Sequence, residues 1–227
     1  MRPSRHAAHY FLFLLSLTFL SACSAHDSRA YDANERRFFD GLYREKVYGK
    51  VFDSESKTKL IQGDFENFFE ATITHWNQRL RKAFVKEMAR VYRMSPGELQ
   101  VLESEELKEN DRYFTFIVSA RSRELRWREL DREDDLWRMS LENEDGSIRI
   151  RPDRIDTISE KDDKWTFFYK SMNRFSKTYR VRFPRKNLES ANRLFFFITG
   201  PLGGLSASFR PDPVDRAESS SSTSPER

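Results

Sequence analysis

The densest group of residues that could do chemistry is the acidic run at residues 131–135, which reads DREDD. Neighbouring carboxylates can hold Ca²⁺ through several oxygens, or they can share the acid and base work of glycoside hydrolysis. The run lacks the spacing and the glycine of an EF-hand loop. We interpret it as a solvated loop between strands, and a carboxylate-dependent hydrolase stays open as an alternative.

Imidazole, the commonest general acid and base, is scarce in this chain. Beyond the apolar N-terminal segment there are only His26 and His75. No acid or cysteine stands at ligand spacing from His75, which favours a histidine of the core over a metal ligand or base. The sequence contains no Gly-x-Ser-x-Gly motif and indicates no cofactor, no metal site and no catalytic residue. It favours a non-catalytic role without settling whether the protein is an enzyme.

Arginine is concentrated in one stretch of the chain. Nine arginines lie between positions 121 and 154, and several alternate along strand-like sequence. A guanidinium binds phosphate and carboxylate groups through two parallel hydrogen bonds, so the stretch predicts an anion-binding or partner-binding face. The candidate residues are Arg123, Arg126, Arg128, Arg138, Arg149 and Arg151. The alternative is cross-strand ion pairing with the interleaved acids Glu124, Glu129, Asp131, Glu142 and Glu144.

The only glycine-rich segment is residues 198–209, ITGPLGGLSASF. A phosphate-binding loop would continue into Lys-Ser/Thr and a helix, whereas strand-like residues follow Gly204. The segment therefore predicts a turn that connects two strands.

Cys23 is the only cysteine, which excludes an intrachain disulfide and a cysteine-based zinc cluster. A basic start is followed by an apolar run at residues 10–20, which is shorter than the roughly 20 residues that span a bilayer. The next residues are Ser21, Ala22 and Cys23. The sequence Leu20-Ser21-Ala22-Cys23 resembles the lipobox of bacterial lipoproteins at all four positions.

This resemblance implies that residues 1–22 are a signal peptide, cleaved before Cys23. It also implies a diacylglyceryl group on the Cys23 sulfur and usually a fatty acid, such as palmitate, on its new amino group. The membrane is then a partner through this lipid, and the location is the bacterial cell envelope. By analogy with enteric lipoproteins, Ser24 after the cysteine favours the outer membrane. It does not decide between the periplasmic face and the surface face of that membrane. The alternatives are an ordinary secretory signal cleaved after Ala25, and a retained membrane anchor.

Composition divides the rest of the chain into three parts. Residues 23–44 are polar and charged and read as a tether with a short helix, and residues 45–210 as a single globular domain. Residues 211–227 are serine-rich and predict a disordered tail. The net charge of +4 is too small to indicate nucleic acid.

The domain begins with two predicted elements. Residues 46–65 indicate a β-hairpin that turns at residues 53–56. Residues 64–93 carry apolar side chains at intervals of three or four, which predicts one long helix. A second helix should then run from Pro96 to about Glu109. Ser95 suits its N-cap, Pro96 suits its first position, and Glu98 completes a capping box with Ser95.

From residue 112 onward apolar and polar residues alternate, which is typical of strands. The predicted strands lie within residues 112–120, 136–142, 147–152, 164–170, 177–184, 193–200 and 205–209. The fold class is α+β: an antiparallel β-sandwich, Ig-like or similar, with about 7–9 strands and with one long and one short helix packed on it. Residues 194–198, LFFFI, should form a central strand that is buried on both faces.

The domain block, with its tryptophan-containing strand and glycine-rich closing turn, loosely resembles bacterial envelope lipoproteins, and this resemblance implies no activity. The anchor and the strand pattern favour a non-catalytic domain that binds or scaffolds an envelope protein, an anionic glycan or a lipid. A carrier of an apolar ligand is an alternative, because the chain has 20 Phe.

Overall fold

The computed structural model describes residues 46–63, 67–131, 136–159, 161–186, 188 and 190–212, all of which belong to one compact unit, Tyr43–Arg227. The predicted signal peptide, the lipobox with Cys23 and the tether lie outside the described residues. The predicted tail also lies outside them, except for Pro211 and Asp212.

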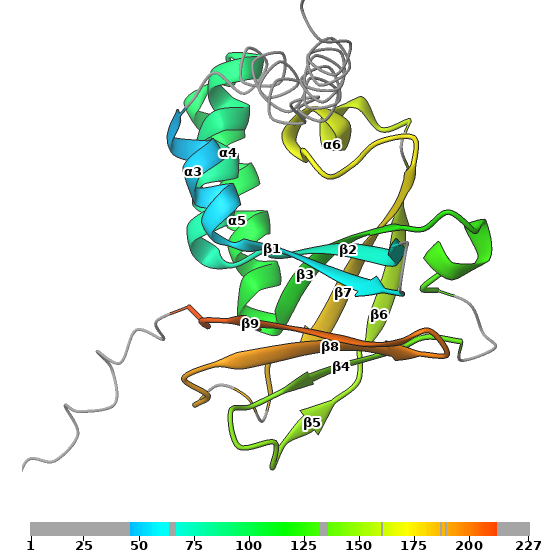
Figure 1. Ribbon diagram of the computed structural model, residues 1–227. Helices are drawn as coiled ribbons and strands as arrows, with labels where there is room; N and C mark the ends of the chain where they lie inside the picture. The colour runs from blue at the N-terminus through cyan, green and yellow to red at the C-terminus, as the bar shows by residue number, and fades with distance from the viewer. Residues whose placement is uncertain are drawn as a thin grey trace, which may run out of the picture. The chain divides into compact units, whose positions relative to one another are not determined.

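Two antiparallel sheets form the framework, which confirms the predicted α+β sandwich-like fold (Figure 1). Every paired strand is antiparallel to its neighbour. Sheet A has the order β1(Ser56–Gln62), β2(Asn67–His75), β3(Tyr113–Arg121), β7(Ser176–Pro184), β6(Arg154–Ile158). Sheet B has the order β5(Arg149–Ile150), β4(Arg138–Glu142), β8(Leu194–Gly200), β9(Gly203–Phe209).

The core between the sheets is built from aromatic rings that alternate along the strands. The ring of Phe116 on β3 lies with its centroid 4.9 Å from that of Phe196 on β8, and Phe69 on β2 stacks on Trp137 at 4.6 Å. All four are buried. Since burying one such side chain stabilises the fold by about 1.5–3 kcal/mol, these rings account for much of the attraction between the two sheets.

Helices cover part of the opposite face of sheet A (Figure 1). Tyr169 donates a hydrogen bond from its hydroxyl to the Ile117 carbonyl of β3, and Tyr48 donates to the Phe168 carbonyl. A second buried cluster around Trp76 and Phe84 joins these groups. The helices are α3(Lys46–Ser54), α4(Gln78–Tyr92), α5(Pro96–Arg112) and α6(Asp163–Phe168), and a 3-10 helix η1(Leu125–Arg128) follows β3.

The predicted long helix over residues 64–93 is wrong in its first half, where the chain forms β2. Phe69 and Ile73 are four residues apart, and a spacing of four fits a strand of period two as well as a helix. Ala71 lies between them and is also buried, as a strand requires. Asn77 then begins α4, because its side chain accepts a hydrogen bond from the Leu80 N–H at 2.9 Å.

Two other predicted elements are also wrong. Residues 46–54 form α3 instead of the first strand of a hairpin, because Tyr48, Val51 and Phe52 bury one helical face. Residues 163–168 form α6 instead of a strand. The strand β6 was not predicted, since only its two isoleucines are apolar.

The second predicted helix is confirmed with its capping box. The Ser95 hydroxyl accepts from the Glu98 N–H, the Glu98 carboxylate accepts from the Ser95 N–H, and Pro96 opens the helix. Strand β8 is central in sheet B as expected, but only one face is fully buried. Phe196 has no exposed surface, whereas Phe195 and Phe197 on the other face are half-buried.

Candidate binding groove

A row of hydroxyl groups crosses the face of sheet A that points away from sheet B. The strand register places hydroxyl residues opposite one another on four strands, β1, β2, β3 and β7. The hydroxyl oxygens of Thr58 and Thr72 are 3.0 Å apart, and those of Ser119 and Thr178 are 2.9 Å apart. Each hydroxyl has one proton and two lone pairs, so Thr58 and Thr72, which are not buried, keep acceptor capacity for a ligand after pairing with each other. Ser119 and Thr178 are only 4% and 2% exposed.

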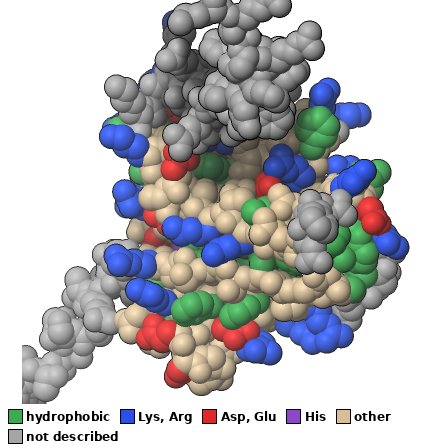
Figure 2. Space-filling model, viewed as in Figure 1, with side chains coloured by type: hydrophobic (Ala, Val, Ile, Leu, Met, Phe, Trp, Pro, Cys, Tyr) green, Lys and Arg blue, Asp and Glu red, His purple; other side chains and the backbone are tan. Residues whose placement is uncertain are grey.

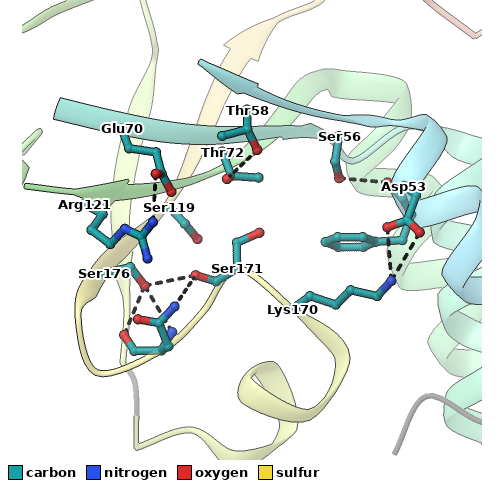
Figure 3. A pocket seen from close by; sticks show the side chains of 12 residues that line it. Asp53, Ser56, Thr58, Glu70, Thr72, Ser119, Arg121, Lys170, Ser171 and Ser176 are labelled. Carbon is teal, nitrogen blue, oxygen red and sulfur yellow. Dashed lines mark hydrogen bonds and ion pairs between the residues drawn. The ribbon is translucent and has the colours of Figure 1, made fainter. Parts of the chain in front are cut away.

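A depression of about 230 Å³ lies over this row, between the end of α3 and the loop that follows α6. Figure 3 shows an ion pair at each side of it, with the hydroxyls between them. Lys170 Nζ lies 3.1 Å from Asp53 Oδ1, and Arg121 Nη2 lies 2.8 Å from Glu70 Oε2. The lining therefore combines neutral hydroxyls with two neutralised charge pairs.

Ser176 fixes the loop that forms the wall of this depression. Its hydroxyl lies 3.0 Å from the carbonyl oxygens of Ser171 and Asn173 and accepts from the Asn173 N–H. The Asn173 side chain in turn accepts from the Phe175 N–H at 2.9 Å. These local bonds hold Phe175 at the surface, where its side chain is 56% exposed.

A second depression, of about 440 Å³, adjoins the first and shares Glu70 and Arg121 with it. We call the two together the binding groove. Its second part is lined by Arg123, Arg128, Leu125 and Phe175, among others. Leu125 is 63% exposed. Guanidinium groups and apolar side chains therefore stand side by side, as hydrophobic and basic side chains do on the right of Figure 2.

Arg128 anchors this part of the groove. Its Nη1 donates to the Phe175 carbonyl at 3.2 Å, which joins η1 to the loop before β7. Its Nε is buried and has no hydrogen-bond partner among the described residues. An N–H that is withdrawn from water without a partner is unfavourable, so a ligand oxygen that reached this atom would gain binding energy.

The structure places the six predicted arginines in two separate regions, the segment with η1 that follows β3 and the β4–β5 part of sheet B. Arg123 and Arg128 line the groove, and Arg126 pairs with Glu124 at 2.9 Å and lies over the Trp127 ring. The other three belong to sheet B or its connections: Arg138 on β4, Arg149 on β5 paired with Glu142, and exposed Arg151 beyond β5. The six arginines therefore do not share one sheet face. Two of the predicted pairings with interleaved acids are present, Arg126 with Glu124 and Arg149 with Glu142.

Sequence reasoning missed the hydroxyl row and the Asp53–Lys170 pair. A signal for the row exists, since serine and threonine recur at every second position in S-K-T (56–58), T-I-T (72–74) and S-K-T (176–178). The ion pair carried no comparable signal, because its partners are 117 residues apart in the chain.

The remaining candidates lie outside the groove. His75 is 1% exposed and stacks on Phe116 at 4.8 Å, and burial lowers its pKa to about 4, in keeping with a core histidine. Asp131, the described part of the acidic run, accepts hydrogen bonds from Thr157 and Lys177. Burial acts to raise the pKa of Asp131, but these hydrogen bonds outweigh it and the pKa is lowered.

The glycine-rich segment is the predicted turn between two strands, β8 and β9. Gly200 pairs with Gly203, and Gly203 has a φ of 125°, which residues other than glycine rarely adopt. A Cβ on Gly200 would lie 2.4 Å from the Trp137 ring, so this position requires the close approach that glycine allows.

The groove supplies hydroxyls, amides, guanidinium groups and an exposed aromatic ring, while its two carboxylates are each occupied by a cation. Within the described residues, no three His, Cys, Asp or Glu side chains are grouped as a metal site would require. This arrangement is equipped to recognise a polar or anionic chain.

No protein-family model matches the chain, and it matches no curated protein and no solved structure significantly. None of the helices in the described part of the chain is long and apolar enough to cross a membrane.

Proposed function

We propose that this protein is a lipid-anchored lipoprotein of the bacterial envelope, and that its sandwich domain binds an anionic glycan non-catalytically in the binding groove. The observation that carries the proposal is the row of hydroxyls between two ion pairs, which opens onto arginines and the exposed ring of Phe175. The anchor part of the proposal depends on the lipobox resemblance at Cys23.

The lining matches the chemistry of a charged sugar chain. Sugar hydroxyls both donate and accept hydrogen bonds, as the hydroxyls of Thr58 and Thr72 can. The flat face of Phe175 can pack against the apolar face of a sugar ring. Arg123 and Arg128 can take carboxylate or phosphate substituents. A polar ligand is also favoured because the four described depressions all carry Lys or Arg side chains.

The two alternatives that the sequence left open gain less support. An apolar-ligand carrier would use an apolar cavity, whereas the aromatic core between the sheets is packed ring on ring. A paired-acid hydrolase would place two carboxyl groups across the ligand. Two carboxylates do stand at opposite sides of the groove, but Asp53 is paired with Lys170 and Glu70 with Arg121, so both are turned toward a cation of the protein (Figure 3).

Binding can be tested with the full chain in non-ionic detergent. The probe is the phosphorylated core oligosaccharide of lipopolysaccharide, with neutral dextran as a reference, and the measurement is the dissociation constant by calorimetry. Thr72→Val removes one hydroxyl without changing volume, and Phe175→Ala removes the exposed ring. Each should weaken binding by roughly five- to tenfold.

The matched controls lie on sheet B or next to it. Thr199→Val removes an exposed hydroxyl of β8, and Arg151→Gln removes an exposed charge. Both should leave the dissociation constant within a factor of two. The proposal is wrong if the oligosaccharide binds no better than dextran, or if the control variants weaken binding as much as the groove variants do.

A further inference from the structure

A separate depression of about 330 Å³ lies where the edge strands of the two sheets meet, β1 from sheet A and β9 from sheet B. We call it the seam pocket. It shares no lining residue with the binding groove. Five parts of the chain contribute: the end of α3, β1, the start of α4, the segment before β8, and β9 with the residue after it. The lining residues are Ser54, Glu55, Lys57, Arg79, Arg193, Ser208, Phe209 and Arg210.

The seam pocket has an excess of positive charge. It holds four Lys or Arg side chains and a single carboxylate, Glu55. Arg79 lies 3.6 Å from Glu55. Within the described residues, Lys57, Arg193 and Arg210 have no carboxylate within 4.0 Å, and all three are exposed. Figure 2 shows a row of Lys and Arg side chains over β1 and β9.

The single carboxylate compensates this charge poorly. The Glu55 side chain is only 14% exposed, and burial raises its pKa despite the neighbouring Arg79. Isolated surface cations are usually solvated and need no partner. Here, however, several cations from separate elements converge on one hollow, and like charges held together are unfavourable unless an anion joins them.

A tertiary contact holds Arg79 and Arg210 of this cluster close together. Both oxygens of Asp212 accept from the Gln78 N–H, at 2.9 and 3.0 Å. This contact holds the segment after β9 against the start of α4, and so it brings Arg210 and Arg79 to the same side of the domain. The convergence of the cations is thus a property of the tertiary structure and not of one flexible loop.

We infer that the seam pocket binds a phosphate group, carried by a phospholipid head group or by a phosphorylated sugar. A phosphate ester presents several oxygens and up to two negative charges, which suit multiple guanidinium forks better than one carboxylate does. The Ser208 hydroxyl lines the pocket and can donate to a further phosphate oxygen. The volume lies within the range of small-ligand sites, about 300–1,000 Å³.

The first test uses the full chain in non-ionic detergent and inorganic phosphate as the probe, with binding followed by calorimetry at low salt. Arg193→Gln and Arg210→Gln should each weaken phosphate binding by roughly tenfold. Their side chains make no hydrogen bond with another described residue, so the melting temperature should stay unchanged. Arg151→Gln, an exposed arginine near sheet B, is the matched control.

The second test compares two carriers of the phosphate, dihexanoyl-phosphatidylglycerol and glucose 6-phosphate. Tighter binding of the lipid assigns a membrane source, and tighter binding of the sugar phosphate assigns a glycan source. Both outcomes support the site if inorganic phosphate competes with the bound molecule. The site is disproved if millimolar phosphate does not bind saturably, or if Arg151→Gln reduces binding as much as the seam variants.

This inference is independent of the proposed groove function, and the same variants separate the two. Arg193→Gln and Arg210→Gln should leave oligosaccharide binding in the groove unchanged when the probe is dephosphorylated. Phe175→Ala should leave inorganic phosphate binding unchanged. One site can therefore fail its test while the other passes.

Discussion

The guanidinium of Arg81 on α4 lies 2.5 Å from the carboxylate of Glu106 on α5, although the Arg81 side chain has no exposed surface. The same guanidinium donates from Nε to the Trp76 carbonyl and from Nη2 to the Thr115 hydroxyl of β3, both at 2.9 Å. Trp76 donates from its indole N–H to Glu106 as well. One buried cation thus joins two helices to the face of sheet A that they cover.

Replacing Arg81 with Met should destabilise the protein by about 3–5 kcal/mol, because Glu106 and the Trp76 carbonyl would lose their buried partner. Lys82→Met, an exposed position on the same helix, should change the free energy of unfolding by less than about 0.5 kcal/mol. Chemical denaturation of both variants measures this difference. Equal effects at the two positions would show that the Arg81 network does not hold the helices in place.

His75 should make stability depend on pH. Burial lowers its pKa to about 4, while Arg185 and Arg81 act in the same direction and Asp212 opposes them. Since the unfolded histidine titrates near 6.5, the unfolded state binds more protons between about pH 4 and 6.5. Stability is therefore fully present above this window and is lost as the pH falls through it, on the order of 3 kcal/mol in total.

The measurement compares unfolding free energies of the wild type and His75→Phe between pH 4 and 8. Phe keeps a ring against Phe116 but cannot take up a proton, so the difference between the two proteins should change across the window and stay flat above it. Carboxylates remote from position 75 affect both proteins alike. Parallel curves for the two proteins would disprove the role of His75.

The strands that the sequence predicted correctly are those with strict alternation and few other options. Tyr113–Arg121 and Ser176–Pro184 pair along their whole length in one register, and one side of each faces the core. The helix that begins after Ser95 was predicted because its cap uses only residues within three positions of one another. These signals are local, so the sequence displays them directly.

The errors arise where local spacing fits two structures. Phe69 and Ile73 satisfy both a helix and a strand, and only pairing with β1 and β3 decides between them. The groove depends still more on distant partners. Ser119 meets Thr178 across 59 residues, and Lys170 meets Asp53 across 117. Alternating arginines reveal which side of a strand they occupy but not which sheet the strand joins.

Asp212 should stabilise the domain strongly for a residue so near the end of the described chain. Its carboxylate is 7% exposed, caps the Gln78 N–H, and accepts from Asn110 and from Arg185 Nη2 at 3.1 Å. Asp212→Ala should lower the free energy of unfolding by about 3 kcal/mol, because Arg185 keeps a buried charge without its partner.

Asp153→Ala is the matched control for this change, since the Asp153 side chain is exposed and makes no hydrogen bond or ion pair among the described residues. Its effect should stay within about 0.5 kcal/mol. Thermal and chemical unfolding of both variants provide the comparison. A loss at Asp212 no larger than that at Asp153 would mean that the segment after β9 is held by other contacts.

The anchor can be tested at Cys23 itself. Two or three acyl chains hold a protein to a bilayer stably, whereas one does so only marginally. The wild type should therefore partition into the detergent phase. Its mature N-terminal peptide should carry the mass of a diacylglyceryl group. Cys23→Ala removes the only sulfur that could take the lipid and should yield a chain without that mass and with its N-terminal segment uncleaved. Ser24→Ala keeps the four lipobox residues and should behave as the wild type in both measurements. A wild-type protein whose N-terminus begins after Ala25, with no lipid attached, would establish ordinary secretion instead, and the groove would then act away from any membrane.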